Sequence, residues 1–119
     1  MTTVNGKVAL VTGGSSGIGE SAVRQLVDAG CVVYAAARRV EKMKPLEEVG
    51  ARILSMDVTD DDSMVSGVEQ IAGEAGGVDI LVNNAGYGSY GAVEDVPIDE
   101  ARRQFEVNIF GVARLTQLV

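Results

Sequence analysis

Glycine and hydroxyl-bearing residues follow an apolar run near the N-terminus, in the order Thr12-Gly13-Gly14-Ser15-Ser16-Gly17-Ile18-Gly19. The apolar run before this segment and the helical pattern after it predict a strand, a turn with exposed backbone and the start of a helix. The first N–H groups of a helix have no intrahelical partner and carry partial positive charge, and glycine lets a ligand approach the backbone. This chemistry favours a bound phosphate, although a glycine-rich turn can also serve only to join a strand to a helix.

Three other polar segments each follow an apolar run, and they too could bind a ligand. They are Arg38-Arg39, Asp57 and Asn83-Asn84-Ala85-Gly86. The carboxyl ends of parallel strands meet at one edge of a sheet, and a crevice opens there at the point where the strand order reverses. We therefore expect these segments and the glycine turn to lie around one crevice.

Four apolar runs alternate with helical patterns, and this alternation is typical of parallel β-α-β units. Strands are expected at 7–12, 31–37, 51–56 and 78–82. A first helix is expected at 17–29, and a second helical stretch is expected to form two turns interrupted by Pro45. A third helix is expected to start after a cap at Thr59 or Asp60, and a fourth to run over about 20 residues from Pro97. The expected fold is an α/β, Rossmann-like parallel sheet with strand order 3-2-1-4 and helices on both faces.

Periodic apolar residues indicate which helix faces meet the sheet. In the first helix, Ile18, Ala22 and Leu26 recur every four residues and predict one buried stripe. In the last helix, the expected buried face comprises Ala101, Phe105, Asn108, Val112 and Leu115.

Composition excludes several classes of function. The 119 residues include 10 cationic and 17 anionic side chains, and the net charge of −7 argues against a nucleic-acid partner. The chain has no histidine, which excludes a Ser-His-Asp triad and a histidine-ligated metal, and its single cysteine, Cys31, is expected to be a buried thiol. No apolar run approaches the ~20 residues that span a bilayer, and no secretory signal is visible. We expect one cytoplasmic domain over residues 1–119, with no metal and no membrane partner.

The glycine turn and Asn83-Asn84-Ala85-Gly86 resemble the TGxxxGxG and NNAG motifs of the short-chain dehydrogenase/reductase family. Asp57-Val58 after the third strand and Val107-Asn108 in the last helix match this family as well. The resemblance covers residues 7–119 and implies a partial Rossmann domain that binds a dinucleotide and is truncated relative to the family.

The resemblance implies a role for each residue that matches the family's motifs. The pyrophosphate of a nicotinamide cofactor would be lined by Gly13, Gly17 and Gly19, with Ser15, Ser16 and Ile18 beside it. The adenine would be bound by Asp57, the Val58 backbone and Val107. The ribose would lie along Asn84, Ala85 and Gly86. Asn108 would be the catalytic asparagine that positions a proton-relay water; the alternative is a helix-interior asparagine whose amide bonds to backbone or water.

The end of the second strand bears on which cofactor is bound. An acidic residue there would accept a hydrogen bond from the ribose 2′-OH and repel a 2′-phosphate, but this chain has Ala37 followed by Arg38 and Arg39. Because a guanidinium binds phosphate with two parallel hydrogen bonds, we predict that NADP(H) is preferred over NAD(H), mainly through Arg38. The alternative is a solvated pair of surface arginines.

The family's chemistry also needs a Tyr-x-x-x-Lys pair and an upstream serine. None of Tyr34, Tyr87 and Tyr90 has a lysine four residues later, and Tyr34 is expected in the core. In one interpretation, which the uncapped helix at the end of the chain favours, the chain is the inactive cofactor-binding half of a longer enzyme. That enzyme would transfer hydride between NADP(H) and a carbonyl or alcohol. In the other, the chain is a non-catalytic dinucleotide-binding or assembly module.

The partners are predicted only in outline. The strand at 78–82 would be an exposed apolar edge if nothing paired with it, and such edges favour association, so we expect a homo-oligomer. The substrate is expected to be a small molecule, and these residues leave its identity open.

Overall fold

The computed structural model describes residues 3–15, 17–88 and 91–119. Its strands are β1 (Val8–Thr12), β2 (Val32–Ala37), β3 (Arg52–Ser55) and β4 (Ile80–Val82). Its helices are α1 (Gly17–Asp28), the 3₁₀ turn η1 (Val40–Met43), α2 (Lys44–Glu48), α3 (Asp61–Ala75), α4 (Ile98–Phe105), the π-helical segment η2 (Glu106–Gly111) and α5 (Val112–Leu118). The two short segments η1 and α2 confirm that this stretch is not one regular helix. The break lies between Met43 and Lys44, and Pro45 is tolerated in the first turn of α2.

The four strands form a parallel sheet in the order β3-β2-β1-β4, which confirms the predicted α/β fold and strand order. In the register of the sheet, Val11 of β1 lies between Ala35 of β2 and Val82 of β4. The strand order reverses between β1 and β4, so the expected crevice lies at the carboxyl ends of these two strands.

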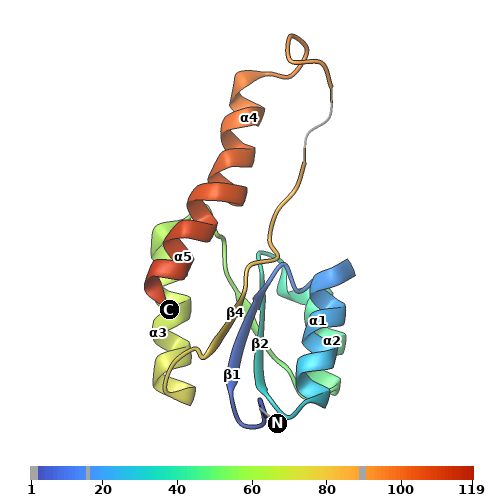
Figure 1. The fold of residues 1–119 in the computed structure, drawn as a ribbon, viewed down its shortest axis with the longest axis vertical. Helices are drawn as coiled ribbons and strands as arrows, with labels where there is room; N and C mark the ends of the chain where they lie inside the picture. The colour runs from blue at the N-terminus through green and yellow to red at the C-terminus, as the bar shows by residue number, and fades with distance from the viewer. Residues whose placement is uncertain (1–2, 16, 89–90) are drawn as a thin grey trace.

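Helices cover both faces of the sheet, as predicted (Figure 1). Successive side chains of a strand point to opposite faces, so Val8 and Leu10 of β1 pack on one side and Ala9 and Val11 on the other. The first side is covered by α3 and α5, and the second by α1 and α2. Because β1 is buried along its whole length, the loop that follows it begins from a rigid position.

Two side chains singled out in the sequence lie in the core, as expected. Tyr34 is 1% exposed, and its hydroxyl donates to Glu74 Oε1 and accepts from Arg52 Nη1, each at 2.8 Å. Burial and the Glu74 hydrogen bond raise the pKa of this phenol, so it stays protonated. Cys31 is a buried free thiol.

The predicted stripe of α1 is wrong at Ile18, which is 81% exposed. Ala22 and Leu26 do pack against the core. In the first turn of α1, Gly19 is the residue that faces the protein, because a Cβ there would meet Gly13 and Asn84. The neighbouring Ile18 faces away from these loops and is left exposed.

The last helix also departs from the prediction. Instead of one regular helix, α4, η2 and α5 follow one another, and α4 extends beyond the sheet (Figure 1). Leu115 of α5 is fully buried, whereas Phe105 is 50% exposed. The wider π turn changes which side of the helix faces the protein, so the expected common face breaks at η2.

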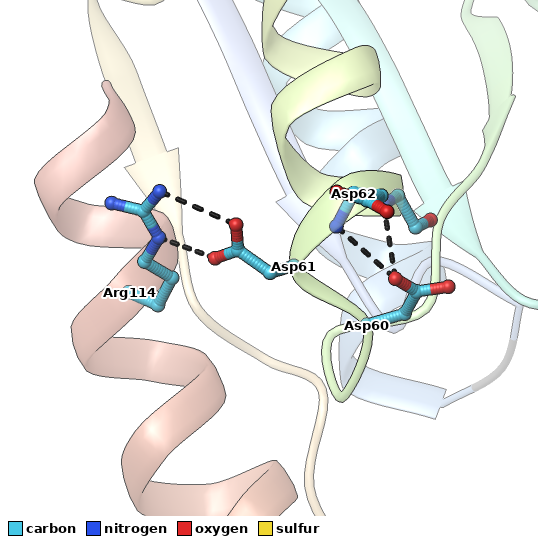
Figure 2. Close-up of polar contacts among 5 residues, drawn as sticks. Asp60, Asp61, Asp62 and Arg114 are labelled. Carbon is cyan, nitrogen blue, oxygen red and sulfur yellow. Dashed lines mark hydrogen bonds and ion pairs between the residues drawn. The ribbon is translucent and has the colours of Figure 1, made fainter.

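An ion pair joins α3 to α5, as Figure 2 shows. Asp60 is the N-cap of α3, with its Oδ1 accepting from the N–H groups of Asp62 and Ser63, and this decides between the two predicted caps. The next residue, Asp61, accepts from Nε and Nη2 of Arg114. These hydrogen bonds and the guanidinium charge hold the pKa of the Asp61 carboxyl below its usual range.

We expect Asp61→Asn to lower the urea midpoint of unfolding at pH 7. Because the folded-state pKa lies below the unfolded value of about 3.9, the pair stabilises the fold above that pH, and the effect is lost as the pH falls through the folded-state pKa. The difference between wild type and variant should therefore shrink below about pH 4. Asp62→Asn is the matched control, because Asp62 lies in the same helical turn and its carboxylate forms no ion pair with the described residues. Equal effects of the two variants would contradict this.

Candidate functional site

Thr12, the last residue of β1, joins the two loops that border the crevice. Its side chain is buried, and its Oγ1 accepts from the N–H groups of Asn84 and Ala85, each at 3.0 Å, while donating to the carbonyl of Val82 at 3.4 Å. Asn84 Nδ2 in turn donates to the carbonyl of Gly13 at 3.1 Å. The loops after β1 and β4 are thus held together. Thr12 belongs to the glycine-rich motif, but the motif alone predicts no role for its side chain.

We expect Thr12→Val to destabilise the chain by about 2 kcal/mol, because two partly buried N–H groups lose their acceptor while the shape of the side chain is kept. Thr12→Ser is the matched control, because it retains the hydroxyl and loses only a methyl, for which about 1 kcal/mol is expected. Urea unfolding followed by circular dichroism measures both. If valine were tolerated better than serine, packing would outweigh these hydrogen bonds.

The glycine turn adopts a conformation that most residues would resist. Gly13 and Gly17 have φ of +66° and +57°, in the left-handed region. A Cβ on Gly19 would lie 2.1 Å from the carbonyl oxygen of Gly13 and 2.6 Å from Asn84 Nδ2. The turn is thereby packed close to the loop after β4, and α1 begins directly behind it at Gly17.

A pocket of about 880 Å³ opens at the carboxyl ends of the strands. It brings together most of the residues for which the sequence predicts a cofactor contact: Gly13, Ser15, Arg38, Asp57, Val58, Asn84, Ala85, Gly86 and Val107. The predicted residues Gly17, Ile18, Gly19 and Asn108 do not line it. Ser16 lies outside the described residues.

The pocket is also lined by several residues for which the sequence predicts no cofactor contact. They are Thr12, Ala36, Ala37, Met56, Thr59, Tyr87, Glu100, Arg103 and Glu106. For the last three, a signal was available, because residues 100, 103, 106 and 107 share one face of a helix. The local sequence does not indicate that this face of the helix turns toward the crevice.

The charged groups of the pocket differ in how far they are already paired. Asp57 Oδ1 accepts from the hydroxyl and the N–H of Thr59 at 2.7 and 2.9 Å. These hydrogen bonds, with a smaller contribution from the charge of Arg38, hold the pKa of the Asp57 carboxyl below its usual range. Arg38 itself is exposed and has no hydrogen-bond or ion-pair partner among residues 3–15, 17–88 and 91–119. Its guanidinium is therefore available to a ligand.

Asn108 lies in η2 and holds the loop after β4 by its side chain. Its Oδ1 accepts from the N–H of Tyr87 at 3.1 Å, and its Nδ2 donates to the Tyr87 carbonyl at 2.6 Å. A Cβ on Gly86 would lie 2.9 Å from the same Oδ1. One N–H and one lone pair of the amide remain beyond these bonds. Asn108 thus positions the loop that forms one side of the pocket.

Two other kinds of feature were considered in the sequence, a membrane-spanning helix and a metal site, and the structure bears on both for residues 3–15, 17–88 and 91–119. In that part of the chain, no helix is long and apolar enough to cross a membrane. The same residues contain no group of three or more histidine, cysteine, aspartate or glutamate side chains that could hold a metal ion.

Comparison with known proteins identifies similar chains. The family model described as short chain dehydrogenase matches residues 7–119. The chain is 40% identical to a 3-ketodihydrosphingosine reductase of Bacteroides thetaiotaomicron over 114 residues, which are 95% of this chain and 40% of the relative. It is 40% identical to an NADPH-dependent 3-dehydrocapnine reductase of Ornithobacterium rhinotracheale over 116 residues, 93% of this chain and 41% of the relative.

The fold is also similar to solved structures. The crystal structure of a short-chain dehydrogenase from Streptomyces avermitilis superposes with a TM-score of 0.92 at 40% identity, covering 96% of this chain and 43% of that one. The chain spans about two-fifths of the length of the curated relatives it matches.

Proposed function

Because this chain belongs to the short-chain dehydrogenase/reductase family, we propose that its pocket binds NADP(H) and serves hydride transfer to or from a carbonyl or alcohol substrate. The printed sequence holds no Tyr-x-x-x-Lys pair. The function proposed for the 119 residues themselves is therefore to bind and orient the cofactor. The transfer is proposed for a protein in which the missing acid–base groups are present.

The shape and chemistry of the pocket fit such a cofactor. Its volume of about 880 Å³ lies in the range of small-molecule sites. Its lining combines two glycine-containing loops with five charged side chains, which are Arg38, Asp57, Glu100, Arg103 and Glu106. Gly17 and Gly19 carry no side chain in the first turn of α1, so a pyrophosphate can approach the backbone at these two positions. When bound, the nicotinamide supplies or accepts the hydride.

Each part of the pocket, and of the glycine turn that contributes Gly13 and Ser15 to it, has a proposed task. Amide groups around Gly13, Gly17 and Gly19, with Ser15 and Ile18 beside them, bind the pyrophosphate. The ribose lies along Asn84, Ala85 and Gly86, and the adenine lies between the Asp57-Val58 segment and Val107. Asn108 keeps the loop at Tyr87 in place.

A single observation carries the choice of NADP(H). Arg38 lines the pocket at the end of β2, directly after Ala37, and no described residue forms a hydrogen bond or an ion pair with its guanidinium. A carboxylate there would instead favour a free ribose 2′-OH. The similarity to a relative named as NADPH-dependent supports the same choice.

Titration of the chain with NADPH and with NADH, followed by nicotinamide fluorescence, tests this function. We expect saturable binding of both, with NADPH at least tenfold tighter, since charge-assisted hydrogen bonds to one phosphate provide about that much. Equal or tighter binding of NADH would overturn the NADP(H) preference. Binding of neither would favour the assembly module over a dinucleotide-binding function.

A further inference from the structure

The helical segments α4 and η2 contribute residues to two separate surfaces, and one of these surfaces is the wall of the pocket. Glu100, Arg103 and Glu106, spaced three residues apart, line the pocket together with Val107. A separate groove is lined by Ile98, Ala101, Arg102, Phe105, Phe110 and, at the boundary, Glu106. The adjacent residues Arg102 and Arg103 therefore face different surfaces.

Arg103 is an exposed cation. Among the described residues, none forms a hydrogen bond or an ion pair with its guanidinium. By contrast, Arg114 farther along the same helix is paired with Asp61, and Arg24 of α1 is paired with Glu20. The five N–H donors of Arg103 are thus free to bind a ligand in the pocket.

The path of the helix places Arg103 near one end of the pocket. A Cβ on Gly111 would lie 2.5 Å from the carbonyl oxygen of Val58, so the helix backbone rests on the loop that follows β3. Val107 and Arg103 follow at intervals of about one turn toward the start of the helix, and both line the pocket. Arg103 therefore lies about one turn beyond Val107, the residue at which the proposed function puts the adenine.

We propose that Arg103 is a second specificity residue, which binds the 2′-phosphate of NADP(H) together with Arg38. This rests on the proposed function. The two guanidiniums come from different elements, α4 and the end of β2, and a phosphate has enough oxygens to accept from both. Glu100 and Glu106 line the same wall and would repel a phosphate, so a cation between them is needed to offset their charge.

Calorimetric titration with 2′,5′-ADP and 5′-AMP tests this, because the two nucleotides differ only in the 2′-phosphate. We expect wild type to prefer 2′,5′-ADP and Arg103→Ala to reduce that preference about tenfold, with a smaller reduction for Arg103→Lys, which keeps the charge but not the fork. Arg102→Ala is the matched control, because it removes the same charge from the neighbouring position outside the pocket. It should leave the preference unchanged.

The outcomes separate this inference from the proposed function. If wild type prefers 2′,5′-ADP and Arg103→Ala keeps the full preference, only the inference is overturned. An equal loss for both nucleotides in Arg103→Ala also overturns it, because the contact would then be with the adenine or the 5′-phosphate. A wild-type chain with no preference overturns both. Thermal unfolding of each variant shows whether the fold is retained.

Discussion

Gly19→Ala is expected to destabilise the chain by about 3 kcal/mol or more, the upper part of the range for overpacked positions. The added Cβ would lie 2.1 Å from the carbonyl oxygen of Gly13 and 2.6 Å from Asn84 Nδ2. Both atoms belong to loops that are tied to β1 and to each other, since Asn84 Nδ2 donates to that same carbonyl. The methyl therefore cannot be accommodated by a rotamer change, and the glycine turn must move away from the loop after β4.

Urea unfolding followed by circular dichroism measures this loss, and Gly73→Ala is its control. Gly73 lies within α3, and a Cβ there would meet nothing within 4 Å. Alanine at this position should stabilise the helix by roughly 0.5–1 kcal/mol, because it restricts the unfolded chain. Opposite signs for the same substitution are thus expected. A Gly19→Ala chain as stable as wild type would show that the turn can move at little cost.

Arg38→Ala is expected to weaken NADPH binding about 10- to 100-fold and to leave NADH binding nearly unchanged. The range corresponds to the roughly 1.5–3 kcal/mol of a hydrogen bond to a charged group. Arg38→Asp should go further, because a carboxylate at this position repels the 2′-phosphate and can accept from a ribose 2′-OH. The ratio of the two dissociation constants is the readout, since misfolding would lower both affinities together.

Arg39→Ala controls for the removal of a nearby positive charge. Arg39 is exposed and adjacent to Arg38 but does not line the pocket. Its removal should change the ratio of the NADPH and NADH dissociation constants by much less than the removal of Arg38. This difference between the two variants should persist at high salt, which screens exposed charges. Equal effects of the two alanine variants would indicate a diffuse electrostatic preference rather than a phosphate contact at Arg38.

Many residues of the crevice could be predicted because they come directly after the ends of strands in the chain. Arg38, Asp57 and Asn84 each come after an apolar run, and parallel strands carry such positions to one edge. Ile18 and Phe105 show the limit of this reasoning. Their apolar spacing is right for a buried helix face, yet both are exposed, because no part of the sheet lies against them.

The sequence by itself determined the strand order and the group of loops at the β1–β4 crevice, because apolar periodicity, caps and glycine positions act over a few residues. Only the tertiary structure decided that Thr12 ties two loops together and that Arg103 reaches the pocket while Arg102 does not. These features depend on contacts between residues that are far apart in the chain, such as Thr12 with Ala85, 73 positions apart, and Asn108 with Tyr87, 21 positions apart. The direction of a helix face relative to a crevice is set by such contacts and by the π turn, and neither leaves a local pattern in the chain.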